Sequence, residues 1–286
     1  MSGGGDGPAP SLDALVPVEM ARRAESVGQT KATMPLRRLI PLSILAGAFI
    51  SLGAMFSTVV TAGGGMAPGV SRLLGGLSFS LGLVLVVVGG AELFTGNTLI
   101  VMAAASRRVR VGTVIRHWIV VYLGNFAGAV ATALLVFWSG QYRSGGGAVG
   151  VRAMDIAAAK TSLGTVEAIA LGVLANALVC LAVWLSFSAR SLTDKVFAVV
   201  FPVTAFVAAG FEHSIANMYF IPEAIFIRAW GADRFWDAAH TTSDRYSGVD
   251  LRGFLLGNLL PVTVGNLVGG GLLVGLVYWF VYLRER

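Results

Sequence analysis

Four ionisable side chains lie within or beside long apolar stretches and are the first candidates for chemistry. They are Glu92, Glu212, the adjoining His213, and Lys160. A charged group at membrane depth is costly, so it is a functional candidate by default. Histidine changes protonation near neutral pH, so His213 could donate a hydrogen bond or a proton to a passing anion. Lys160 precedes an apolar stretch. It is either a solvated loop lysine or a cation at a pore mouth that raises the local anion concentration.

Glycines stand beside both glutamates. Gly89 and Gly90 precede Glu92, and Gly210 precedes Glu212. Glycine beside a carboxylate in an apolar span predicts that the helix breaks there. The exposed backbone groups of a broken helix are tolerated only where they line a cavity or bond to protein. Each glutamate has the alternative role of capping its broken helix by accepting backbone N–H bonds, so neither is interpreted as catalytic.

The other two histidines are interpreted as surface residues. His117 lies near a predicted helix end and His240 lies in a predicted loop.

The composition defines the class of protein that must position these groups. The chain has 286 residues, of which 56% are hydrophobic and 13% charged. Soluble domains carry about 25% charged residues, so a typical cytosolic enzyme and a disordered chain are excluded. A single cysteine, Cys180, excludes an intramolecular disulfide framework. We interpret the net charge of +6 as basic loops facing the cytoplasm and not as a nucleic-acid site.

Apolar windows long enough for a transmembrane helix predict six spans. They cover residues 39–71, 73–106, 117–142, 168–189, 196–222 and 253–283. We therefore expect an all-α membrane protein with its six-helix channel domain at 37–286.

Residues 1–36 are expected to form a cytoplasmic tail and an interfacial helix. The tail has no signal-peptide pattern. Residues 11–33 are predicted to form a helix on the membrane face, with Leu12, Leu15, Val16 and Val18 on its apolar side. Lys and Arg are concentrated before the first span, after the second and fourth, and at the C-terminus, which predicts that both termini are cytoplasmic.

The six spans divide into two sets of three that carry the same elements in the same order. The paired segments are Gly47–Ser51 with Gly172–Asn176, Glu92–Asn97 with Glu212–Asn217, and Gly124–Gly128 with Gly265–Gly269. With three helices per half, the second copy enters the membrane from the opposite side. This predicts an inverted repeat with helices 2 and 5 broken and a site between the halves at mid-membrane.

At these residues the sequence resembles the formate/nitrite transporter family. The supporting segments begin at Gly89, Gly210 and Pro261, and read GGAELFTG, GFEHSIANM and PVTVGNLVGGGLLVG. The runs LANALVCLAVW from Leu174 and YWFVYLRE from Tyr278 resemble the formate channels of enteric bacteria. Glu92 and Gly96-Asn97 depart from those channels, which have Asp and Ser-Thr there. The resemblance implies a homopentamer in a bacterial inner membrane, with an aquaporin-like fold and one pore per protomer.

The resemblance also implies roles for individual residues. Phe79, Leu83 and Phe94 would form the cytoplasmic constriction, with Leu93 and Thr95 on the flexible stretch of broken helix 2. Phe206 and Val179 would form apolar lining on the periplasmic side. His213, Thr95 and Asn176 would face the pore between the constrictions, supported by Lys160 and Glu212.

Apolar constrictions exclude a bare anion, because an unpaired charge in an apolar medium costs many kcal/mol. Lys160 would draw formate in, and His213 would give it a proton, so that neutral formic acid passes. The pKa of a carboxyl group is about 4, and a nearby cation lowers it, so desolvation must drive this protonation.

Nitrite is the main alternative cargo, and hydrosulfide, acetate and lactate are further ones. A remote alternative is an intramembrane serine protease, but Gly76-Leu-Ser-Phe79 lacks the second glycine of its motif. We expect a transporter and not an enzyme, with no catalytic residue, metal, cofactor, ATP-binding loop or nucleic-acid partner. Its partners are a small anion, the lipid bilayer and other copies of the chain.

Overall fold

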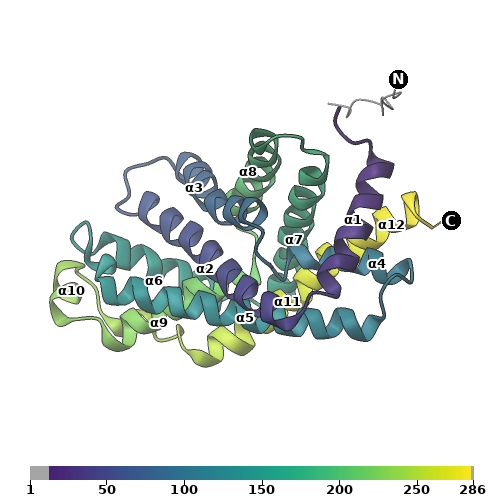
Figure 1. The fold of residues 1–286 in the computed structure, drawn as a ribbon. Helices are drawn as coiled ribbons and strands as arrows, with labels where there is room; N and C mark the ends of the chain where they lie inside the picture. Colours follow the sequence, from purple (N-terminus) through teal and green to yellow (C-terminus); the bar gives the residue numbers. More distant parts are fainter. Residues whose placement is uncertain (1–12, 285–286) are drawn as a thin grey trace, which may run out of the picture.

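Long apolar helices dominate the computed structural model, which describes residues 13–284 (Figure 1). The predicted tail 1–10 and Leu12 lie outside the described residues. Within them, five helices are long and apolar enough to cross a membrane: α2 (Leu36–Val60), α3 (Pro68–Gly89), α5 (Val111–Ser139), α7 (Thr165–Ser188) and the helix Gly253–Tyr282. The last one contains α11 (Leu260–Asn266) and α12 (Val277–Tyr282), with π-helical segments Gly253–Leu259 and Leu267–Leu276.

Two predicted spans are divided into separate helices, as the glycine pattern predicts. After α3 the chain runs without helix to a short 3-10 helix, Gly96–Ile100, and then α4 (Val101–Ala105). The window 196–222 is split between α8 (Leu192–Ala208) and α9 (Ser214–Trp230). Gly90 and Gly210 have φ of 74° and 76°, the left-handed conformation that only glycine adopts without strain. Gly89 is still helical, so the first break begins one residue later than its sequence position suggests.

Short helices connect the long ones. They are α6 (Ala148–Thr161), α10 (Asp233–Ala238) and the 3-10 turns Gln141–Arg143 and Ser243–Tyr246. Lys160 lies in the last turn of α6, which corrects the expectation of a loop lysine. The window 39–71 also proves too long, because α2 ends at Val60 and a turn containing Gly63, Gly64 and Gly65 follows.

The N-terminal helix α1 (Pro17–Ala32) packs on the protein. Its buried face consists of Met20, Ala21, Ala24, Gly28 and Ala32, and it contacts α4, α7 and α12. Contact of this helix with the membrane face stays a prediction. Val16 precedes α1 and is 55% exposed, while the small residues of α1 are buried.

Close helix packing depends on glycines in matching places. A Cβ on Gly128 would collide with the Ile44 carbonyl of α2, and one on Gly269 would collide with the Val173 carbonyl of α7. These contacts draw α5 against α2 and the last long helix against α7.

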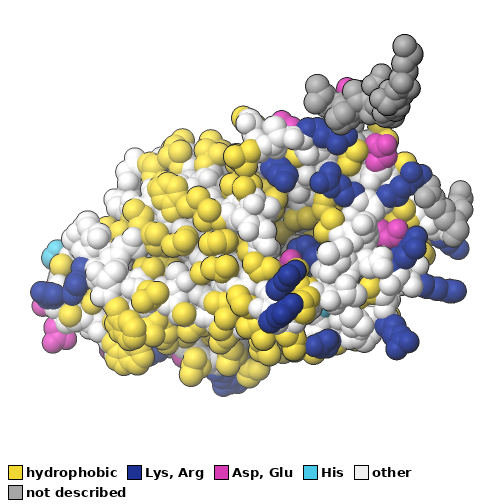
Figure 2. Space-filling model, viewed as in Figure 1, with side chains coloured by type: hydrophobic (Ala, Val, Ile, Leu, Met, Phe, Trp, Pro, Cys, Tyr) yellow, Lys and Arg dark blue, Asp and Glu magenta, His cyan; other side chains and the backbone are white. Residues whose placement is uncertain are grey.

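The surface supports the membrane assignment. Hydrophobic side chains cover the middle of the face in Figure 2, and Lys and Arg gather towards the end that carries α1, α4 and α12. Exposed apolar residues include Leu123, Leu135, Phe201, Leu256 and Phe280.

Candidate functional site

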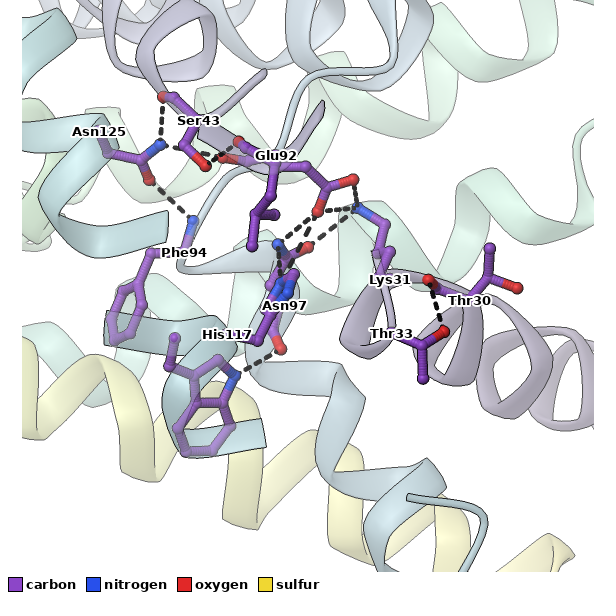
Figure 3. Close-up of polar contacts among 11 residues, drawn as sticks. Thr30, Lys31, Thr33, Ser43, Glu92, Phe94, Asn97, His117 and Asn125 are labelled. Carbon is purple, nitrogen blue, oxygen red and sulfur yellow. Dashed lines mark hydrogen bonds and ion pairs between the residues drawn. The ribbon is translucent and has the colours of Figure 1, made fainter. Parts of the chain in front are cut away.

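A buried polar cluster joins α1 to the first broken segment (Figure 3). The Lys31 ammonium lies 3.0 Å from Glu92 Oε1 and donates to Asn97 Oδ1 at 2.9 Å. The Asn97 amide nitrogen donates to Glu92 Oε2 at 2.7 Å and contacts His117 Nε2 at 3.0 Å. We call Lys31, Glu92, Asn97 and His117 the first cluster.

A second cluster has the same plan at the second break. The Lys160 ammonium lies 2.8 Å from Glu212 Oε1, and Asn217 Nδ2 donates to Glu212 Oε2 at 2.7 Å. Asn258 accepts from Asn217 at 2.6 Å and donates to Glu212 Oε2 at 3.1 Å. We call Lys160, Glu212, Asn217 and Asn258 the second cluster.

Two asparagine side chains form hydrogen bonds with the backbone where the helices break. Asn125 accepts from the Phe94 amide and donates to the carbonyls of Ser43 and Glu92. Asn266 accepts from the Ser214 amide and donates to the carbonyls of Gly172 and Glu212. The backbone groups freed by each break are therefore satisfied by a neighbouring helix, as an apolar surrounding requires.

The glutamates do not cap the broken helices, contrary to the alternative considered from the sequence. Their oxygens accept from side chains, in particular Lys31, Asn97, Lys160, Asn217 and Asn258. His213 is the cap of α9, because its Nδ1 accepts the backbone N–H of Ala216 at 3.1 Å. Several charge-assisted hydrogen bonds to a buried carboxylate anchor the segment that carries it.

The two broken segments meet at His213 and Thr95. His213 Nε2 and Thr95 Oγ1 are 2.9 Å apart, and both residues are buried. Since Nδ1 accepts a bond from Ala216, the proton of a neutral ring lies on Nε2 and points to the Thr95 hydroxyl. The contact places a hydrogen-bond donor of the second broken segment beside a hydroxyl group of the first.

Three side chains hold Thr95 in place through hydrogen bonds to its carbonyl oxygen. That oxygen accepts from Thr98 Oγ1 at 2.7 Å, from Asn176 Nδ2 at 3.3 Å and from the Cys180 thiol at 3.4 Å. Asn176 also donates to the Asn266 carbonyl at 2.6 Å, which links the anchor to the last long helix. Asn176 therefore holds Thr95 in place through its amide nitrogen.

Aromatic rings surround the His213–Thr95 contact. Phe206 stacks on the His213 ring with centroids 5.9 Å apart, and Phe79 meets Phe206 edge-on at 5.6 Å. Phe79 also stacks on Phe220, and the Lys160 ammonium lies 5.5 Å from the Phe220 ring centroid. The sequence-predicted Phe79, Phe206 and Lys160 are thus linked through one row of rings.

The remaining apolar candidates lie in different places. Leu83 and Leu93 line a cavity of about 250 Å³ together with Gly28, Lys31 and Glu92. Phe94 is outside that lining, and its ring packs on Trp118 and Tyr122 of α5. Val179 is buried in the central core.

The sequence reasoning missed two members of the first cluster. His117 is 2% exposed, so its assignment to the surface was wrong. Lys31 was counted only as a charge of the N-terminal tail, and its position over the first break depends on how α1 docks. The asparagines carried a signal, since Asn97 and Asn217 close the paired segments that reveal the repeat.

Comparisons with known proteins place the chain in a family. The formate/nitrite transporter family profile matches residues 18–280. The formate channel FocA of Escherichia coli (strain K12) is 48% identical over 276 residues, which is 96% of this chain and 97% of that protein. FocA of Haemophilus influenzae is 41% identical over 263 residues, covering 92% and 93%. A solved pentameric formate channel with formate bound superposes with a TM-score of 0.83 at 45% identity, covering 87% of this chain and 98% of that one.

The fold and the site therefore define a helical membrane transport protein, and not an enzyme. The chain belongs to the formate/nitrite transporter family.

Proposed function

We propose that this chain is a formate channel of a bacterial inner membrane, with both termini in the cytoplasm. The similarity to formate channels over nearly the full length supports the cargo. The excess of Lys and Arg beside α1 and at the turn before α5 supports the orientation.

The proposed architecture is six transmembrane segments in two inverted three-helix repeats, with one pore in each protomer of a homopentamer. Matched contacts support the repeat. The Glu92 amide donates to the Leu42 carbonyl, and the Glu212 amide donates to the Leu171 carbonyl. Lys31 and Lys160 are separated by the same number of residues as Leu42 and Leu171. The solved pentameric relative supports the assembly.

One observation carries the proposed pore: the buried His213–Thr95 contact between aromatic and aliphatic residues. We assign Leu83 and Leu93 to an apolar constriction on the α1 side, and Phe79 and Phe206 to the one beside His213. Phe94 and Val179 would support these constrictions from the core. Lys160 is paired with Glu212, so its attraction for an anion is weaker than that of a free lysine.

Proton transfer by His213 has a structural requirement. A neutral ring that gave up its Nε2 proton would become an anion, so the donor must be the imidazolium. Forming it needs a proton on Nδ1, and the Ala216 amide then loses its acceptor. The imidazolium passes its Nε2 proton to formate directly or through the Thr95 hydroxyl, which leaves formic acid and a neutral ring. Each transfer thus opens the cap of α9.

The test is uptake of labelled formate and nitrite by proteoliposomes, with and without an inward proton gradient. We expect formate to be preferred and its uptake to rise with the gradient. His213→Asn retains a good helix cap but cannot titrate, so it should transport formate without gradient stimulation. Preference for nitrite would change the cargo, and unchanged stimulation in His213→Asn or His213→Phe would reject the histidine relay.

A further inference from the structure

A basic pocket lies at the end of the molecule that carries α4 and α12, on the side where Figure 2 shows Lys and Arg gathered. Its volume is about 530 Å³. Three arginines line it: Arg107 and Arg108 from the turn after α4, and Arg284 just after α12. The other polar residues of the lining are Ser106, Trp279 and Glu25. We call this site the arginine pocket.

The positive charge of the arginine pocket is only partly compensated. Arg108 Nε lies 3.9 Å from Glu25 Oε2, which is the one ion pair that the pocket contains among residues 13–284. The Arg107 side chain has no ion pair or hydrogen bond within that range, and the Arg284 guanidinium lies 4.6 Å from the Phe280 ring centroid. Three arginines against one glutamate leave a net charge of +2 and several N–H donors without an acceptor.

Ser106 adds a hydroxyl donor to these arginines. Trp279 Nε1 donates to Ser106 Oγ at 3.0 Å, and an indole N–H can only donate, so the serine oxygen is the acceptor. The hydroxyl proton of Ser106 has no acceptor among the residues that the structure describes. Arginine N–H groups in a planar fork and a hydroxyl group are the donors that bind phosphate oxygens.

Arg107 occupies an unusual backbone conformation. Its φ is 59°, in the left-handed region where a Cβ is penalised and glycine is not. Strained backbone of this kind persists where the rest of the structure holds it, and it concentrates at functional sites. Here the strained residue lines the pocket and carries a guanidinium without an ionic partner.

The pocket lies where two membrane-spanning helices end. The spanning helix α5 begins at Val111, and the last long helix ends at Tyr282. Both present exposed apolar side chains close to these ends, in particular Ile115 on α5 and Phe280 and Val281 on α12. The ends of spanning helices lie at the level of the lipid headgroups, where Trp and Tyr are also enriched. The polar pocket is therefore at the depth of lipid phosphates, and the exposed apolar residues are at the depth of acyl chains.

We propose that the arginine pocket binds the phosphate group of an anionic phospholipid. Arg107, Arg284 and Ser106 donate to the phosphate oxygens, while Arg108 is shared with Glu25. The net positive charge repels the ammonium group of a zwitterionic headgroup, so phosphatidylglycerol is preferred over phosphatidylcholine. This inference does not depend on which anion the pore carries.

The test is native mass spectrometry of the full-length protein in detergent, titrated with dioleoylphosphatidylglycerol or with dioleoylphosphatidylcholine. We expect phosphatidylglycerol to bind roughly tenfold more tightly, and the double variant Arg107→Gln/Arg284→Gln to lose this preference. Arg110→Gln is the matched control, because Arg110 lies in the same turn but outside the pocket lining. It should change the affinity by less than about twofold.

Arg107→Gly separates lipid binding from folding. It removes a guanidinium from the pocket and also relieves the left-handed backbone. We expect the lipid-free protein to become more stable to heat, while its affinity for phosphatidylglycerol falls roughly fivefold. If Arg107 had a structural role alone, stability would fall and lipid affinity would not.

Four results would overturn the proposal. Equal affinity for the two lipids would remove the charge preference, and an unchanged preference in the double variant would place lipid binding elsewhere. Equal losses in Arg110→Gln and the double variant would indicate general attraction to a basic surface. Displacement of phosphatidylglycerol by inorganic phosphate at the same concentration would make this a site for a soluble anion.

Discussion

The first and second clusters share a lysine, a glutamate and an asparagine in the same relation to a broken helix, but they are buried to different degrees. The Lys160 side chain is 14% exposed and the Lys31 side chain is 28% exposed, whereas both glutamates are almost fully buried. Lys160 comes from α6 and contacts the Phe220 ring. Lys31 comes from α1, which precedes the long helices.

The same arrangement of polar side chains therefore occurs in two structural settings. The second cluster is built from elements between and within the long helices and contains only one titratable pair. The first cluster includes Lys31 from α1, and it adds His117. We infer that the second cluster holds its broken segment, while the first also attaches α1 to the channel domain.

The largest expected effect comes from removing each carboxylate charge. Glu212→Gln leaves the buried Lys160 without its ionic partner. We expect the free energy of unfolding to fall by about 2–3 kcal/mol. This is below the range for fully buried pairs because Lys160 keeps some exposure. Glu92→Gln should cost about 1 kcal/mol, since Lys31 is more exposed and retains its bond to Asn97. The temperature at which the assembly is lost in size-exclusion chromatography measures both.

Equal losses in these two variants would contradict the comparison. A larger loss for Glu92→Gln would reverse it and make the docking of α1 the main source of stability.

The next prediction concerns a position at which the two halves of the repeat carry residues of different size. Gly270 stands where the first half has Ala129, at the same separation as Asn125 and Asn266. A Cβ on Gly270 would collide with Thr98, Asn176 and Cys180, which anchor Thr95. We expect Gly270→Ala to cost about 1–3 kcal/mol and to reduce formate uptake, because overpacking displaces the anchor.

Gly271→Ala is the matched control for that variant. Its nearest neighbour would be the Thr98 carbonyl oxygen at 3.9 Å, an ordinary contact. Uptake and stability close to those of the natural protein are expected for it. If both alanine variants behaved alike, the anchor around Thr95 would not be the sensitive element.

The smallest expected effect comes from the glycines at the two helix breaks, where both halves should lose the same stability. Gly90→Ala and Gly210→Ala place a Cβ in open space, so only the left-handed backbone is penalised, at about 1 kcal/mol each. Gly89→Ala is the control, because Gly89 ends α3 with helical backbone. Thermal stability of the three variants should show two equal losses and one much smaller change. Unequal losses would mean that the two breaks carry different strain.

Local signals were sufficient for the breaks and for part of the site. The glycines beside Glu92 and Glu212 predicted where the helices divide, and the position of His213 after Glu212 predicted a buried polar group. Those inferences depend on one stretch of chain and its hydrophobicity. The predicted ends of the spans were less accurate, because 61–67 is apolar enough to extend a span although it forms a turn.

Contacts between residues far apart in the sequence could not be predicted from local patterns. His117 looked like a surface residue because it lies near the start of an apolar window, yet α1 and the broken stretch cover it. Lys31 looked like one of several basic tail residues. The capping role of His213 was also not predicted, because the sequence offers the two glutamates as acceptors of backbone N–H groups.

From the residues alone we could predict the apolar helices, the two breaks, the repeated order of elements and the family. Each follows from composition, local glycine chemistry or motifs within a short window. The packing of the helices was needed to learn which lysine meets which glutamate, that His117 is buried beside Asn97, and that Thr95 meets His213. The reason is physical: a polar group in an apolar interior must find a partner, but the choice of partner depends on how distant helices pack.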